Sequence, residues 1–174
     1  MMKYSVTSVE ASKMLKKLME EKRILAENEG MSAWFNAALG EDVESVRPEY
    51  DYAKVQEELE NIDTKIRILK HAINLFNASQ VVPVSEMTID QVLVYIPQLT
   101  EMKNKLYEMQ SSLPKQRTAA IGIGRNAVID YRYANYDVAR AKEDYAKVSD
   151  ELRKVQTALD IVNTTVKMEV ELPD

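Results

Sequence analysis

The sequence predicts a mainly α-helical protein: an elongated antiparallel helical bundle or coiled coil of about four helices, with a small β element at residues 128–133 and 166–172. Apolar residues recur with heptad spacing along several long segments, which is typical of helices that pack against other helices. The 174 residues include only 4 Gly and 5 Pro, which argues against a turn-rich β fold. A chain of this length fits a single helical domain over residues 1–174.

The first helix is expected at about residues 8–29. Thr7 and Glu10 match a capping box, in which the Thr7 side chain accepts a hydrogen bond from the Glu10 amide while Glu10 reaches back to the start of the helix. Gly30 is suited to end this helix, because a residue without Cβ readily adopts the left-handed conformation.

Residues 31–47 interrupt the helical pattern and contain Trp34, the sole tryptophan, beside Phe35. The simpler interpretation is a hydrophobic plug that covers one end of the bundle. The alternative is an exposed site for a partner, since aromatic pairs are favoured anchors in protein interfaces.

The most regular heptad pattern lies in the second helix, expected at about residues 48–77. Its a positions are Val55, Ile62, Leu69 and Phe76, and its d positions are Tyr52, Leu59, Ile66 and Ile73. Pro48 fits the first helical turn, where its missing N–H costs nothing. His71, the only histidine, falls at position c, so we expect a solvated surface residue rather than a ligand or a base.

Two further helices are expected at about residues 89–112 and 138–164. Thr88 begins a second capping box at the start of the third helix. Pro97 lies inside that helix, where it removes a backbone hydrogen bond and clashes with the preceding turn, so we expect a kink or a break. Asp137 is suited to cap the last helix.

Two sequence patterns predict which segments pack against each other: one concerns a strand at the end of the chain, and the other concerns two helices. Residues 166–172 alternate between apolar and polar, which predicts a short strand that pairs with residues 128–133 in the same chain or with another subunit. The second helix contains Asp51–Val55, and the last helix repeats that sequence as Asp144–Val148. Equal length and register make these two helices natural neighbours.

Residues 115–142 are locally basic and rich in tyrosine. Interleaved cations and aromatic rings are typical of surfaces that bind single-stranded nucleic acid. A solvated hairpin whose tyrosines pack on a neighbouring element is the simpler interpretation. The segment also contains Gly122–Ala127, which matches the string G-x-G-x-x-A. No dinucleotide site is expected there, because a predicted strand follows it where a helix is required.

Composition excludes several other kinds of site. The chain has no Cys, which excludes disulfides, thiolate catalysis and zinc–thiolate sites. Ile68 stands where a Glu-x-x-His metal motif ending at His71 would need Glu. No nucleophile–base set is credible, and we therefore expect no catalytic residues, no metal, no cofactor and no enzymatic activity.

Charge and hydropathy predict where in the cell the protein is located. The formal net charge of −5 gives no general reason to expect nucleic-acid or membrane binding. The first residues lack the apolar core of a signal peptide, and no apolar run approaches the ~18 residues of a membrane span. We expect a soluble cytoplasmic protein that does not bind membranes.

The overall pattern resembles a family of small uncharacterised bacterial coiled-coil proteins, some of which are called septicolysin. The resemblance depends on the Ser/Thr start of the first helix, on Ile73–Asn77, on Thr88–Asp90 and on Asn163–Val166. It implies a long helical coiled-coil protein without an assigned reaction. Met31–Leu39 and Pro97 depart from the family pattern. A thiol-dependent lytic role, which the name implies, is contradicted by the lack of Cys.

The sequence therefore favours a non-enzymatic structural or protein-interaction protein that forms homo-oligomers or binds an unidentified partner protein. The alternative is binding of nucleic acid or another anionic partner through residues 115–142. The candidate interaction residues are Trp34, Phe35, Arg117, Arg125, Tyr131, Arg132 and Tyr133.

Overall fold

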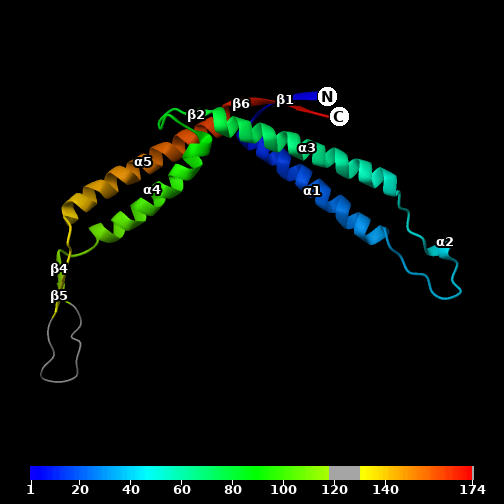
Figure 1. The fold of residues 1–174 in the computed structure, drawn as a ribbon, viewed down its shortest axis with the longest axis horizontal. Helices are drawn as coiled ribbons and strands as arrows, with labels where there is room; N and C mark the ends of the chain where they lie inside the picture. The colour runs from blue at the N-terminus through cyan, green and yellow to red at the C-terminus, as the bar shows by residue number, and fades with distance from the viewer. Residues whose placement is uncertain (118–129, 174) are drawn as a thin grey trace, which may run out of the picture. The chain divides into compact units, whose positions relative to one another are not determined.

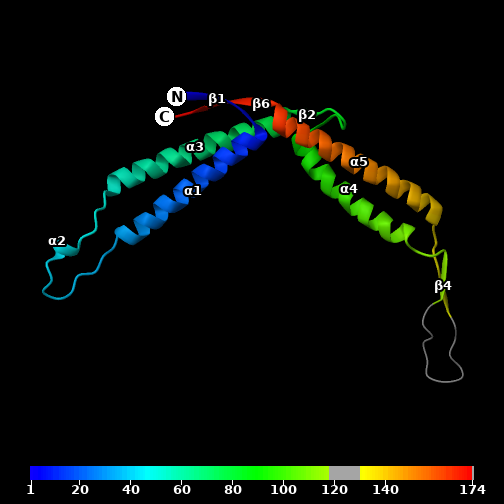
Figure 2. The same cartoon turned by 180° about the vertical axis from the view of Figure 1, so that it is seen from behind.

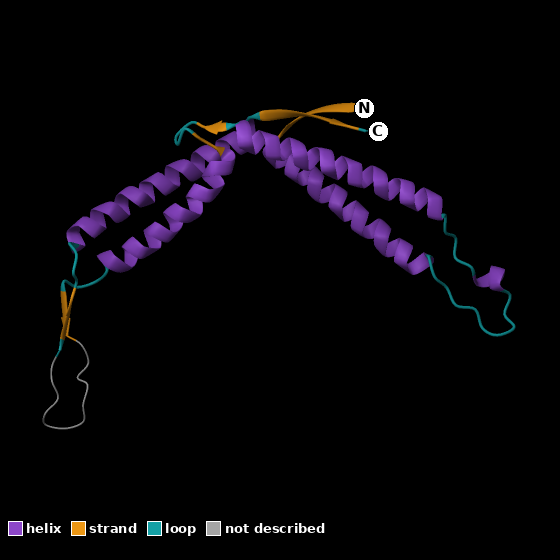
Figure 3. Ribbon diagram, viewed as in Figure 1, coloured by secondary structure: helices purple, strands orange, loops and turns teal. Residues whose placement is uncertain are grey.

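The computed structural model describes residues 1–117 and 130–173, which are mainly helical with three short antiparallel strand pairs (Figures 1 and 3). The elements in chain order are β1 (Met2–Thr7), α1 (Ser8–Ser32), α2 (Val43–Val46), α3 (Tyr52–Ser79), β2 (Val81–Val82), β3 (Met87–Thr88), α4 (Ile89–Gln110), β4 (Lys115–Arg117), β5 (Tyr131–Tyr133), α5 (Val138–Thr165) and β6 (Lys167–Leu172). The predicted mainly α class with a small β element is confirmed.

The contacts within the chain divide it into two units, whereas the sequence predicted a single helical domain. Unit 1 comprises Met1–Gln80 and Ile161–Asp174, and unit 2 comprises Val81–Asp160. Each unit is built on one pair of helices. α3 belongs to unit 1 and most of α5 to unit 2, and the pairing of these two similar helices remains a prediction. The four-helix bundle remains a prediction.

Unit 1 is built on α1 and α3, which lie side by side in both views of the ribbon (Figures 1 and 2). At 28 residues, α3 is about 42 Å long at a rise of ~1.5 Å per residue. Its a position Leu69 is fully buried and Phe76 is nearly so, whereas Tyr52 at the other end is 66% exposed. The heptad pattern is therefore covered best in the second half of α3.

The two ends of the chain form a strand pair that covers part of α3. β1 and β6 are antiparallel, with register running from Met2↔Leu172 to Thr7↔Lys167. In β6, alternate residues are buried, and this strand contacts α3. The strand predicted at residues 166–172 is thus confirmed, but the predicted pairing within the chain is wrong for the described residues 130–133. The N-terminal strand supplies the partner of β6, and β4, close in sequence, pairs with β5 instead. Pairing with another subunit remains a prediction.

Unit 2 is built on α4 and α5, whose contact includes a cluster of the buried residues Leu99, Val148 and Leu152. Tyr107 and Tyr145 add a ring contact with centroids 5.9 Å apart. α4 runs through Pro97, so the break considered for this helix does not occur. A short hairpin of β2 and β3 precedes α4, and Glu86 in its turn has a φ of 55°.

The helix ends confirm some capping predictions and correct others. Both capping boxes, at Thr7 and Thr88, are present, and Asp137 caps α5 by accepting from the Ala139 amide at 2.8 Å. The prediction for Gly30 is wrong, because α1 continues to Ser32 and ends in a right-handed cap. Pro48 also lies outside α3, which begins at Tyr52 after an Asp51 cap.

Replacing Thr7 with Ala is expected to lower the free energy of unfolding of unit 1 by about 1 kcal/mol, because an N-cap oxygen is lost from α1. The Thr7 amide and the Thr7 hydroxyl donate to the Glu10 carboxylate at 2.8 and 3.1 Å. The hydrogen bond from the amide is the main cause that lowers the pKa of Glu10. The stabilisation that the ionised Glu10 carboxylate gives to the folded state is therefore fully present above the ordinary glutamate pKa. It is lost as the pH falls through the lowered pKa of Glu10.

Urea unfolding at neutral pH measures the Thr7→Ala effect, with Ser12→Ala on the exposed side of α1 as the control. An equal loss in both variants would show that the cap is not the cause. The pKa of Glu10, measured by NMR, should rise in Thr7→Ala while staying below its ordinary value, because the backbone amide still donates.

Candidate functional site

The connection between α1 and α3, residues 33–51, exposes several large apolar side chains. Trp34 is 86% exposed and Leu39 is fully exposed. The predicted hydrophobic plug is therefore wrong for Trp34, because no element of unit 1 covers it. Phe35 is half-buried under Arg47, whose guanidinium carbon lies 5.3 Å from the ring centroid. The two aromatic residues predicted as one pair thus have different environments.

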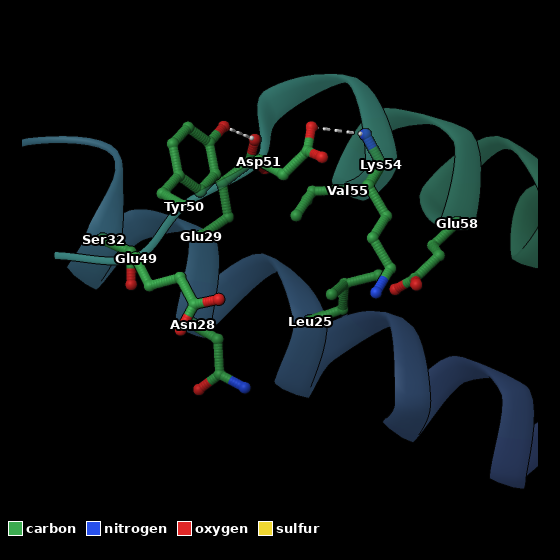
Figure 4. A pocket seen from close by; sticks show the side chains of 10 residues that line it. All are labelled: Leu25, Asn28, Glu29, Ser32, Glu49, Tyr50, Asp51, Lys54, Val55 and Glu58. Atoms are coloured by element: carbon green, nitrogen blue, oxygen red, sulfur yellow. Dashed lines mark hydrogen bonds between the residues drawn. The ribbon is translucent and has the colours of Figure 1, made fainter.

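An open pocket of about 280 Å³ lies beside this connection, between the end of α1 and the start of α3 (Figure 4). Four carboxylates line it: Glu29, Glu49, Asp51 and Glu58. Lys54 is the single basic residue of the lining, and its backbone amide donates to the Asp51 carboxylate at 3.2 Å. The excess of carboxylates makes the pocket suited to a cationic group.

Glu29 joins the two helices through its carboxylate. The Tyr50 hydroxyl donates to Glu29 Oε1 at 2.8 Å, and the Gln56 side-chain amide donates to the same oxygen at 2.6 Å. The hydrogen bond to Glu29 is the main cause that raises the pKa of Tyr50 to about 12. No pattern in the sequence predicted this site, because its members are separated by more than twenty residues and no spacing rule connects them.

Titration of Tyr50 tests this contact. We expect its hydroxyl to stay protonated to about pH 12 and the Glu29→Gln variant to titrate closer to an ordinary tyrosine, since the anionic acceptor is gone. The stabilising effect of the bond is present below the ordinary tyrosine pKa and is lost as the pH rises through the raised value. NMR of ring-labelled tyrosine measures the titration, and the signal absent from Tyr50→Phe assigns it. A Tyr50 pKa unchanged in Glu29→Gln would contradict the contact.

The second candidate region is the two-stranded ribbon of β4 and β5 in unit 2. Its register is Lys115↔Tyr133, Gln116↔Arg132 and Arg117↔Tyr131. Because side chains alternate between the two faces of a strand, Lys115, Arg117, Tyr131 and Tyr133 share one face, which we call the basic tyrosine face. Arg132 lies on the opposite face and lines an open pocket of about 320 Å³ at the base of the ribbon.

Cation–π contacts order the basic tyrosine face. The Lys115 ammonium lies 4.2 Å from the ring centroid of Tyr131 and 5.4 Å from that of Tyr133. Such contacts contribute about 0.5–1 kcal/mol at exposed sites. The ribbon is joined to α4 at its base, where the Tyr136 hydroxyl donates to the Met109 carbonyl at 3.0 Å.

The structure groups some predicted site residues and separates others. Trp34 and Phe35 lie in unit 1, whereas Arg117, Tyr131, Arg132 and Tyr133 lie in unit 2. The grouping of Arg117 with the two tyrosines follows from the strand register, which the sequence alone did not predict. Arg125 and the string Gly122–Ala127 lie outside the described residues.

Within residues 1–117 and 130–173, no group of three or more His, Asp or Glu side chains is placed to hold a metal ion. His71 is exposed on α3, beside β6. None of the described helices combines the length and apolar character needed to cross a membrane.

Comparisons with known proteins show a likeness of fold. No family model matches the chain, and no curated protein matches it. The chain is similar to a solved structure described as a functionally unknown conserved protein from Corynebacterium diphtheriae, with a TM-score of 0.55 and 15% sequence identity over 95% of this chain and 99% of that one. At this identity the likeness shows the fold alone. The resemblance to the septicolysin group remains a prediction.

Proposed function

We propose that the protein is a non-enzymatic interaction protein that binds a partner protein at the connection between α1 and α3. The observation that carries this proposal is the exposure of Trp34, at 86%. Tryptophan is among the residues that contribute most to protein interfaces, and an isolated tryptophan in water gains nothing from its large apolar surface.

The surroundings of Trp34 support the same function. Met31 is 72% exposed on the last turn of α1, and Leu39 and Val43 are exposed farther along the connection. Exposed apolar side chains gathered in one segment are typical of interaction sites. The acidic pocket beside them would favour a partner that presents a lysine or arginine near its apolar contact.

Site-specific photo-crosslinking tests the proposal. A photoreactive phenylalanine analogue replaces Trp34 in one strain and Lys70, exposed on α3, in a matched control strain. We expect a defined crosslinked protein at position 34 and none at position 70. A crosslink between two copies of this chain would identify the partner as the protein itself, and light scattering would then give the oligomeric state.

Binding measurements with the crosslinked partner complete the test. Trp34→Ser is expected to weaken binding about 30-fold, the effect of losing an interface residue worth ~2 kcal/mol, whereas Asn36→Ser in the same connection should bind as the original protein does. Equal crosslinking at both positions, or unchanged affinity in Trp34→Ser, would contradict the proposal.

A further inference from the structure

We propose that the β4–β5 ribbon binds single-stranded nucleic acid on its basic tyrosine face. The ribbon belongs to unit 2, and binding there does not depend on the partner site proposed in unit 1. The register of the two strands collects two cations and two aromatic rings on one face. Positive charge that follows a phosphate backbone, combined with rings that stack on bases, is the common chemistry of single-strand binding.

The four side chains are accessible to a ligand. Tyr131 is 48% exposed and Tyr133 is 62% exposed, and Lys115 and Arg117 are exposed as well. The face carries no carboxylate, although the whole chain has a net charge of −5. A polyanion would therefore meet a local positive charge at the ribbon.

The two rings are spaced for two successive bases. Residues two apart on a strand are about 6.6 Å apart along it, at a rise of ~3.3 Å per residue. This spacing is about twice the ~3.4 Å between stacked bases of one strand. A single strand is able to extend to that spacing, whereas a duplex keeps its bases stacked and paired. The geometry therefore favours single strands.

Lys115 has a role in the unbound ribbon. Its ammonium lies 4.2 Å from one ring centroid and 5.4 Å from the other, and so it contacts both rings. Exposed cation–π contacts are weak, so an arriving base replaces the ammonium on the ring. The displaced ammonium then lies where the phosphates pass, together with the Arg117 guanidinium.

The composition of the face distinguishes nucleic acid from other anionic partners. A membrane-binding surface buries Trp, Phe or Leu side chains at the lipid boundary, and none of the four described side chains of the basic tyrosine face is of these types. An acidic protein segment would pair with the cations and has no need of the rings. The tyrosines are therefore the feature that indicates nucleic acid.

Fluorescence anisotropy with the full chain and a labelled oligothymidylate tests this proposal over a series of salt concentrations. We expect saturable binding that weakens as salt increases. Tyr131→Ile and Tyr133→Ile should each weaken binding about tenfold, through lost stacking, and leave the salt dependence unchanged. Arg117→Gln should weaken binding and reduce the slope of log K against log salt by about 0.7.

Matched variants separate stacking from folding. Tyr131→Phe keeps the aromatic ring and should bind as the original protein does, whereas Tyr131→Ile keeps the β propensity of the strand and loses the ring. Tyr52→Leu and Lys70→Gln, at exposed positions of unit 1, should have no effect.

Three results would overturn the inference. The first is no binding of the oligothymidylate at low salt. The second is unchanged affinity in both isoleucine variants, which would leave only general attraction between charges. The third is binding of a polyglutamate peptide, or of duplex DNA, as tightly as the single strand and with equal affinity in the isoleucine variants, which would indicate an acidic protein or a non-selective polyanion surface.

Discussion

Leu69→Ala is expected to lower the free energy of unfolding of unit 1 by about 2–5 kcal/mol, the range for a leucine truncated in a packed core. Leu69 is fully buried in α3, on the helix that contacts both α1 and β6. The substitution removes apolar contacts and leaves a cavity, because the surrounding helices and strands relax only partly around the truncated side chain. Native-state hydrogen exchange at the amides of α1 and α3 measures the loss.

Leu75→Ala is the matched control for this experiment. Leu75 lies on the same helix and is 57% exposed, so its truncation should change the free energy of unfolding by no more than about 0.5 kcal/mol. If the two variants lost the same stability, the packing of α3 as described would be wrong.

Val170→Asp is expected to destabilise unit 1 by about 3 kcal/mol or more and to separate the β1–β6 pair from α3. Val170 is 3% exposed and lies on β6, the strand that contacts α3. A carboxylate there loses its hydration without gaining a partner. Exchange of the β1 amides with solvent should accelerate in parallel, because β6 is their partner.

The pH dependence identifies the cause of the Val170→Asp effect. Burial raises the pKa of the introduced carboxyl, so its cost is largest above that pKa and decreases as the pH falls through it. Lys167→Ala, at an exposed position of the same strand, is the control and should have little effect. A loss in Val170→Asp that stays constant as the pH is lowered would show that shape, and not charge, is responsible.

The long helices could be predicted because their information is local. Capping residues such as Thr7 and Thr88 mark helix starts through hydrogen bonds to amides three residues away, and the apolar period predicts which face is buried. Two helix boundaries were predicted wrongly: Gly30 does not end α1, because the helix continues to Ser32, and Pro48 does not begin α3, because Asp51 caps that helix instead. Alternation in residues 166–172 likewise predicted a strand, which the structure has at Lys167–Leu172.

The candidate sites could be predicted only in part. The sequence indicated Trp34 and the tyrosines of the basic segment, because the segments that contain them have a composition unusual for this chain. The tertiary fold decides whether other elements cover Trp34. The strand register decides which cations share a face with the tyrosines. The Glu29 site was not predicted at all, since it joins residues that α1 and α3 bring together from distant parts of the chain.

By itself, then, the sequence determined the helical class, the starts of α1, α4 and α5, and the unusual composition of the regions around Trp34 and Tyr131. All of these depend on residues within about two turns of one another. Only the tertiary structure decided the partners: α1 with α3, α4 with α5, and β6 with β1. Heptad positions are similar in every long helix, so they specify that a helix is paired without specifying its partner. That choice depends on connection lengths and on the summed burial of many weak contacts, which no single residue encodes.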